Sequence, residues 1–154
     1  MLALIDRLPP RALARPGLGG GEWSPKDLIG HLESWEEHAL SAIAAWGRDE
    51  PAPIDRALRE QGLTRVNLAE VARKARRSVP AAFASAAATH ERLLGVIRGL
   101  PAERWSAPAT SRGRAPLGRR VGQILVGTRD PFAHDSAHLK SLRAFVEEHG
   151  RPER

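Results

Sequence analysis

The chain has 154 residues, of which 42% are hydrophobic, so it is long enough for one domain with a buried core. It contains no cysteine, which excludes disulfides, thiolate metal sites and a cysteine nucleophile, so any metal must be bound by His, Asp or Glu. No apolar run approaches the roughly 20 residues of a membrane span, and Asp6 ends the first apolar stretch too early for a signal peptide. We therefore expect a soluble, cytoplasmic protein.

The net charge of +6 raises nucleic-acid binding as an interpretation. However, the basic residues are spread along most of the chain, only 5% of residues are aromatic, and tyrosine is absent. The densest basic cluster, at residues 73–77, falls in a helical pattern where a solvated face is the simpler explanation. We therefore do not expect a nucleic-acid partner.

Apolar residues repeat every three or four positions, and strand or hairpin signals are absent, which predicts an all-α fold. Only residues 2–8 are available for a first helix, because two prolines and a glycine run, typical of a flexible loop, follow it. The next helix has a clear start: Ser24 can cap it, Pro25 suits its first turn, and Asp27 completes a capping box. Helical spacing extends it to Gly47.

Proline and glycine breaks divide the rest of the chain. Helices are predicted at 54–61, from 67 to a break near Ser78 caused by Pro80, at 81–98 and at 119–148, the last with a restart at residues 130–131. Residues 106–118 are rich in Ser, Pro, Gly and Arg and predict an exposed, mobile loop. The expected plan is a bundle of about four main helices.

Two histidines of the last predicted helix, His134 and His138, are four residues apart. At about 100° per residue they share a face with Leu142 and Phe145, so both should point into the bundle. His31, on the predicted second helix, lies near enough to that helix's apolar stripe to reach the same interior. Three neutral imidazoles with an open fourth position suit catalytic zinc, and imidazole also suits nickel, iron or copper.

A structural interpretation stays open on this pattern alone. Each histidine could be a core or boundary residue bonded to a backbone carbonyl or a carboxylate, although three such residues would each need a polar partner. His38, seven residues after His31, is either a fourth ligand or a boundary residue. His90 and His149 show no spacing signal and are expected to face solvent.

Two motifs resemble a known family. The stretch Gly-Glu-Trp-Ser-Pro-Lys-Asp-Leu-Ile-Gly-His-Leu at 21–32, followed by Trp-Glu at 35–36, resembles the W-S-x-K-D-x-x-x-H-L…W-E signature of DinB/YfiT-like four-helix-bundle proteins. The stretch His-Asp-Ser-Ala-His-Leu at 134–139, followed by Leu-Arg at 142–143, resembles their H-x-x-x-H-L motif. The resemblance implies one DinB-like domain over 1–154, an all-α four-helix bundle with a shortened N-terminal helix.

The resemblance also implies a ligand set and a chemistry. One histidine from the first motif and two from the second typically hold a metal in such proteins, and these correspond to His31, His134 and His138. The family includes transferases and isomerases dependent on mycothiol, bacillithiol or glutathione, and a branch that hydrolyses a reactive genotoxin. We therefore expect a divalent metal, whether zinc, nickel, iron or manganese, that activates a low-molecular-weight thiol or water for attack on a small electrophilic substrate in detoxification or stress response.

Further roles and alternatives follow from the resemblance. Trp35 would line the pocket, Asp135 or Glu36 would carry a proton, and Ser141, where many relatives have Gln, would contact substrate; core packing and solvated carboxylates are the simpler readings of the first three. The alternatives are a non-enzymatic bundle that binds a metal or small molecule, and a metal-independent hydrolase. A homodimer partner, or part of residues 67–80, would cover the side left thin by the short first helix.

Overall fold

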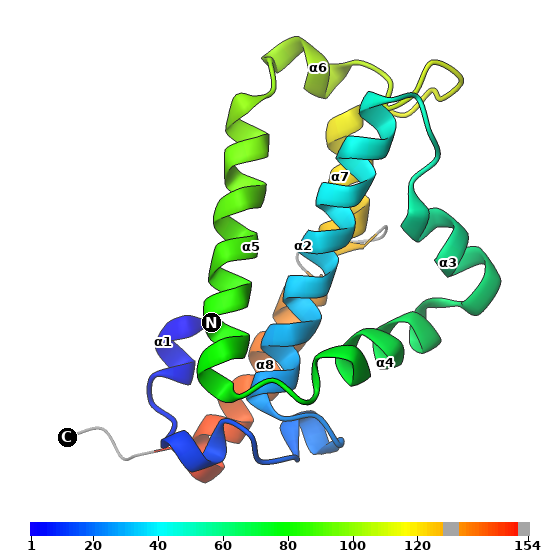
Figure 1. The fold of residues 1–154 in the computed structure, drawn as a ribbon. Coiled ribbons are helices and arrows are strands. Elements are labelled where there is room, and N and C mark those ends of the chain that lie inside the picture. Colours follow the sequence, from blue (N-terminus) through cyan, green and yellow to red (C-terminus); the bar gives the residue numbers. More distant parts are fainter. Residues whose placement is uncertain (128–132, 151–154) are drawn as a thin grey trace.

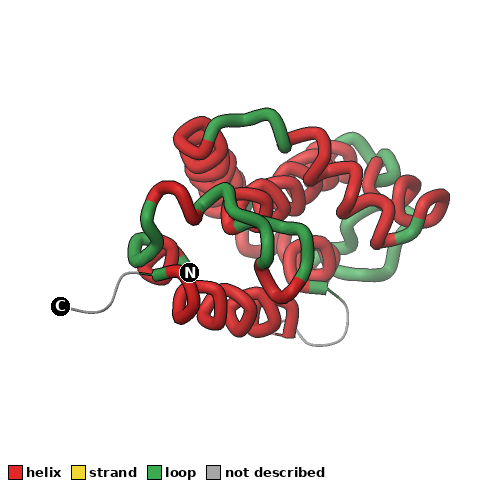
Figure 2. The backbone as a smooth tube through the Cα atoms, turned by 90° about the horizontal axis from the view of Figure 1, so that it is seen from below, coloured by secondary structure: helices red, strands yellow, loops and turns green. Residues whose placement is uncertain are grey.

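The computed structural model describes residues 1–127 and 133–150, without the side chains of Leu2 and of residues 133–135. The described residues form eight α-helices and two short 3-10 segments, and their one β-type pairing is an isolated bridge (Figures 1 and 2). The elements are α1 (Leu2–Ile5), η1 (Pro10–Ala12), η2 (Leu18–Gly20), α2 (Pro25–Gly47), α3 (Pro53–Gln61), α4 (Leu63–Lys74), α5 (Val79–Gly99), α6 (Ala102–Ser106), α7 (Leu117–Val126) and α8 (Ala133–His149).

The all-α bundle and its short first helix are confirmed. Helix α2 contacts α5 and α7, and α8 contacts α7, α1 and η2, so α2, α5, α7 and α8 are the main helices (Figure 1). No helix among the described residues is long and apolar enough to cross a membrane.

Helix α2 begins at the predicted capping box. The Ser24 hydroxyl accepts the Asp27 backbone N–H at 3.2 Å, and the Asp27 carboxylate accepts the Ser24 N–H at 2.9 Å. The same carboxylate also accepts the Ser24 hydroxyl at 2.7 Å. These bonds satisfy otherwise orphaned donors of the first turn, and Pro25 has no N–H there to satisfy. The start of α2 is therefore determined locally, which sets where the residues further along it point.

Ser24→Ala removes this cap from a residue that is only 1% exposed. We expect the free energy of unfolding to fall by about 1 kcal/mol, the usual effect of losing an N-cap. Urea denaturation followed by circular dichroism measures this loss. Ser41→Ala is the matched control, because Ser41 lies on the exposed face of the same helix; equal midpoints for the two variants would contradict a stabilising cap.

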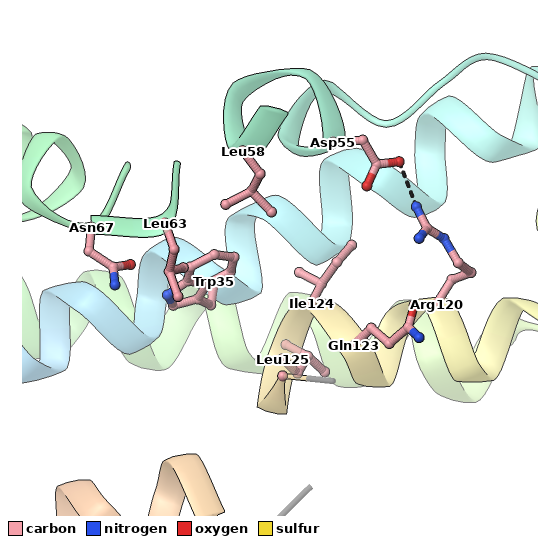
Figure 3. A pocket seen from close by; sticks show the side chains of 10 residues that line it. Trp35, Asp55, Leu58, Leu63, Asn67, Arg120, Gln123, Ile124 and Leu125 are labelled. Atoms are coloured by element: carbon pink, nitrogen blue, oxygen red, sulfur yellow. Dashed lines mark hydrogen bonds and ion pairs between the residues drawn. The ribbon is translucent and has the colours of Figure 1, made fainter. Parts of the chain in front are cut away.

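The α3–α4 arm leaves the upper end of α2 and returns toward its lower end (Figure 1). Leu58 of α3 and Ile124 of α7 point toward one another across the space beside α2 (Figure 3). Gly62, with φ of 77°, makes the turn within the arm, and α4 begins directly after it at Leu63. The predicted start at residue 67 is therefore wrong, because a single glycine in the left-handed region suffices for the turn.

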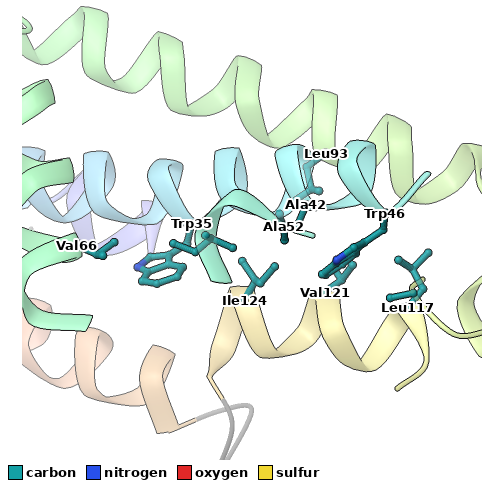
Figure 4. Packing of buried hydrophobic residues seen from close by; sticks show 12 residues of the cluster. Trp35, Ala42, Trp46, Ala52, Val66, Leu93, Leu117, Val121 and Ile124 are labelled. Atoms are coloured by element: carbon teal, nitrogen blue, oxygen red, sulfur yellow. The ribbon is translucent and has the colours of Figure 1, made fainter. Parts of the chain in front are cut away.

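The central cluster is the larger of two groups of buried apolar residues. Figure 4 shows it as a row along α2, from Val66 and Trp35 at one end to Trp46 and Leu117 at the other. Ala39 and Ala42 have no exposed surface, so these small side chains allow neighbouring elements to approach α2 closely. The cluster consists of Trp35, Ala39, Ala42, Trp46, Ala52, Ile54, Val66, Leu93, Ala109, Leu117, Val121 and Ile124.

The N-terminal cluster joins the two ends of the chain. It consists of Ile5, Leu8, Ala12, Leu18, Leu28, Ile29, Leu142, Phe145 and Val146. The glycine run packs on α8 here instead of forming the predicted flexible loop: a Cβ at Gly19 (φ 65°) would lie 3.0 Å from the Ser141 hydroxyl. The first twenty residues therefore cover α8.

Two other predictions need correction in the last third of the chain. The helix predicted over 119–148, with a restart at 130–131, is two helices: α7 already ends at Val126, where Gly127 follows with φ of 87°, and α8 begins at Ala133. The predicted restart at 130–131 lies outside the described residues. The loop at 106–118 is exposed only in part, since Ala109 is buried and Asp49 accepts both the N–H and the hydroxyl of Ser111. This loop is therefore anchored to the end of α2.

The break between α4 and α5 is confirmed. Helix α4 ends at Lys74, the Ser78 hydroxyl caps α5 by accepting the Ala81 N–H at 3.3 Å, and Pro80 lies in the first turn of α5. A proline is tolerated there because first-turn N–H groups have no partner within the helix. The short helix α6 was not predicted.

Candidate functional site

The rings of His31 and His138 lie against one another, with centroids 5.2 Å apart and planes at 65°. His31 is 1% exposed and His138 is half-buried. The ring centroids of Trp23 and Trp35 lie 5.0 and 6.3 Å from that of His31. The structure therefore brings together two of the three predicted ligands in a largely apolar setting.

Helix periodicity explains this meeting. His31 lies one turn after Leu28 and one turn before Trp35, and both neighbours are buried on the inward face of α2. On α8, His138 lies one turn before Leu142, which has no exposed surface. The inward direction predicted for these two histidines is therefore observed.

His134 and Asp135 lie in α8 by their backbone, one turn and three residues before His138. Their side chains are outside the described residues, so the predicted third ligand and the predicted proton carrier Asp135 stay predictions. Among the described side chains, no group of three His, Asp or Glu could hold a metal ion.

A cavity of about 380 Å³ adjoins His31 through Trp35, whose ring centroid lies 6.3 Å from that of His31. It is lined by Met1, Leu32, Trp35, Glu36, Leu125, Val126 and Leu139. Leu32 and Leu139 directly follow the two histidines in sequence. The predicted residues Trp35 and Glu36 therefore belong to this cavity, whereas Ser141 lies against Gly19.

Glu36 has a partner across the bundle. Its carboxylate is 2.7 Å from Nδ1 of His90 on α5, and the two side chains are 22% and 54% exposed, respectively. His90 faces solvent as predicted. His149 does not, because its ring packs edge-on against Phe145 at 4.4 Å and its side chain is only 12% exposed.

His38 packs away from the histidine pair, with Nε2 3.4 Å from the Glu70 carboxylate of α4. Burial lowers the pKa of His38, and the nearby carboxylates of Glu70 and Glu37 only partly offset this effect. Burial alone would raise the pKa of Glu70, but its bond to Arg73 prevails and the pKa is lowered. The boundary role predicted as one alternative for His38 fits this placement.

A buried charge cluster at Glu33 connects helices α2, α4 and α5. Lys74 of α4, 4% exposed, lies 2.8 Å from the carboxylate of Glu33, which is 1% exposed. Arg77 also donates to Glu33 at 2.8 Å, Ser85 of α5 donates at 2.5 Å, and Lys74 donates to the Gly30 carbonyl at 3.2 Å. The prediction of a solvated face for residues 73–77 is thus wrong at Lys74.

Burial raises the pKa of the Glu33 carboxyl, but the hydrogen bonds from Lys74 and Ser85 outweigh it and the pKa lies below its ordinary value. Glu33 is therefore ionised at neutral pH. Because Glu33 is two residues from His31, this cluster holds the part of α2 that carries His31 against α4 and α5.

The comparisons with known proteins agree with this architecture. The family model for the DinB superfamily matches residues 1–128, a range that contains His31 and ends before His138. No curated protein and no solved structure matches the chain. Since the family model covers most of an all-α bundle with a short first helix, the chain belongs to the DinB superfamily.

Proposed function

We propose that the chain binds one divalent metal ion through His31, His134 and His138 and uses it for thiol transfer to, or hydrolysis of, a small electrophile. The contact between the His31 and His138 rings, 5.2 Å apart on two different helices, is the observation that supports this most directly. Membership of the DinB superfamily, whose members are generally metal-associated, is consistent with it.

The donors fit a metal. Neutral imidazole nitrogens bind zinc, nickel and iron, and side chains on facing helices of a bundle are held rigidly from two directions. Trp23 and Trp35 surround His31 with apolar surface, which limits competition from water. His134 would complete the set by helical spacing, one turn before His138 on α8.

A bound divalent ion supplies Lewis acidity, which makes a thiol or water nucleophilic near neutral pH without a cysteine in the protein. The apolar lining of the neighbouring cavity, including Leu32, Leu125 and Leu139, would bind the body of the electrophile and exclude water. Glu36 would accept the proton of the nucleophile, and His90 would pass it to solvent, because the two groups are 2.7 Å apart and His90 is exposed. Asp135 is the alternative proton carrier.

The test is metal content. The full chain, purified without chelator and loaded with zinc, nickel, manganese or ferrous iron, should retain close to one equivalent by mass spectrometry. His31→Ala and His138→Ala should each weaken binding by more than the roughly 10–100-fold effect of removing a supporting residue, because each removes a ligand.

His90→Ala is the matched control, since His90 is exposed and lies away from the pair; it should keep the metal. Circular dichroism shows whether each variant is folded. A folded native chain that takes up none of the four metals would overturn the proposal. A chain that binds metal is then screened for transfer of low-molecular-weight thiols.

A further inference from the structure

A second cavity, of about 320 Å³, lies between the α3–α4 arm and helices α2 and α7 (Figure 3). Its apolar wall comes from α2, α3, α4 and α7 and consists of Trp35, Leu58, Leu63, Ile124 and Leu125. Trp35 and Leu125 also line the cavity that contains Glu36, so the two spaces adjoin at these two residues. The volume is at the lower end of the range for small-molecule sites.

Asn67 of α4 provides a polar atom at one end of this cavity. Its Oδ1 atom is buried and has no hydrogen-bond donor among the described residues. Figure 3 shows this oxygen directed toward Leu63 and Trp35. A buried carbonyl oxygen without a donor is unfavourable, so a ligand that supplies an O–H or N–H here gains more than one that does not.

At the opposite end of the cavity, one positive and one negative side chain form an ion pair. Arg120 of α7 pairs with Asp55 of α3 at 2.5 Å (Figure 3). Its guanidinium also lies 5.3 Å from the centroid of the Trp46 ring. Because the two opposite charges are paired at this end, a charged ligand would gain attraction from one group and repulsion from the other. The site therefore favours a neutral molecule.

The lip of the cavity is unusually apolar. Leu63, the first residue after the turn at Gly62, lines the cavity and is 56% exposed. An apolar ligand resting on Leu63 and Trp35 would cover part of that surface and gain from its burial. The exposed leucine, the buried acceptor and the paired charges therefore all favour a neutral, largely apolar ligand with one hydrogen-bond donor.

We infer that this cavity binds a small neutral molecule with an aromatic or branched apolar body and one hydroxyl or N–H donor, of which a substituted phenol is representative. The body lies against Trp35, Leu58 and Ile124, and the donor bonds to Asn67 Oδ1 after a rotation of the Asn67 side chain turns this buried atom into the cavity. The inference does not depend on the metal function proposed above.

Isothermal titration calorimetry of the full chain tests this with 4-ethylphenol, its methyl ether 4-ethylanisole, and anionic 4-hydroxybenzoate. The phenol should bind at least about tenfold more tightly than the ether, which lacks the donor. It should also bind at least about tenfold more tightly than the anion. Equal affinity for phenol and ether, or no binding of the phenol at millimolar concentration, would overturn the inference.

Four variants locate the binding. Asn67→Leu should abolish the preference for the phenol over the ether, and Ile124→Trp or Leu58→Phe should abolish binding by filling the cavity. Leu68→Ala is the control, because Leu68 is equally exposed on α4 but does not line the cavity.

Discussion

Replacing Lys74 with methionine should lower the free energy of unfolding by about 3 kcal/mol, among the largest effects expected for a single change in this chain. The substitution keeps most of the apolar stem but leaves the 1% exposed carboxylate of Glu33 without its closest buried cation. Arg77 and Ser85 still contact Glu33, which is why we expect the lower end of the usual range for a broken buried pair. Urea denaturation at neutral pH measures the loss.

Neutral pH is the right condition because the pKa of Glu33 is lowered from 4.5. Stability from a carboxyl with a lowered folded-state pKa is fully present above its unfolded value and is lost as pH falls through the folded value. Arg76→Met, at an exposed position two residues away, should leave stability unchanged. The double variant Lys74→Met with Glu33→Leu should recover part of the loss, because it removes the uncompensated charge; equal effects at residues 74 and 76 would refute this account.

Leu142→Ala should cost about 2–5 kcal/mol, because Leu142 has no exposed surface and lies in the N-terminal cluster that holds α8. Since α8 also carries His138 one turn earlier, we expect weaker metal retention in the folded variant as well. Urea denaturation and metal content on the same preparation measure the two effects.

Leu142→Met, which nearly conserves volume, should lose less than about 1.5 kcal/mol and keep the metal. Lys140→Ala, at an exposed position on the same helix, controls for loss of helix propensity. A Leu142→Ala variant as stable as Leu142→Met would show that the N-terminal cluster does not determine the position of α8.

The parts of the fold set by neighbouring residues were predictable. The capping box at Ser24 and the break before Pro80 depend on chemistry within a few residues, and both were located correctly. The inward direction of His31 and His138 needed only the helical period. These predictions concern one helix at a time, which is what a periodic pattern can determine.

The errors concern contacts between distant segments. Lys74 has the composition of a solvated residue, and its burial depends on Glu33 and the Gly30 carbonyl, more than forty residues earlier. The sequence does contain a weak signal for this burial: Glu33 and Glu37 lie one turn apart on α2, and two neighbouring carboxylates favour basic side chains from another helix as partners. The end of α7 was placed too late because the break was assigned to the proline at residues 130–131, whereas the backbone already turns at positive φ at Gly127.

The packing of α8 by the first twenty residues also determines the order of assembly during synthesis. Leu18 emerges long before Phe145, which belongs to the same cluster, and at roughly 5–20 residues per second the ribosome needs on the order of ten seconds to make the chain between them. The central cluster, whose members among the described residues all precede Val126, can form during this interval. The contact between His31 and His138 is therefore completed last, so a nascent chain that already has most of its core has no complete histidine site.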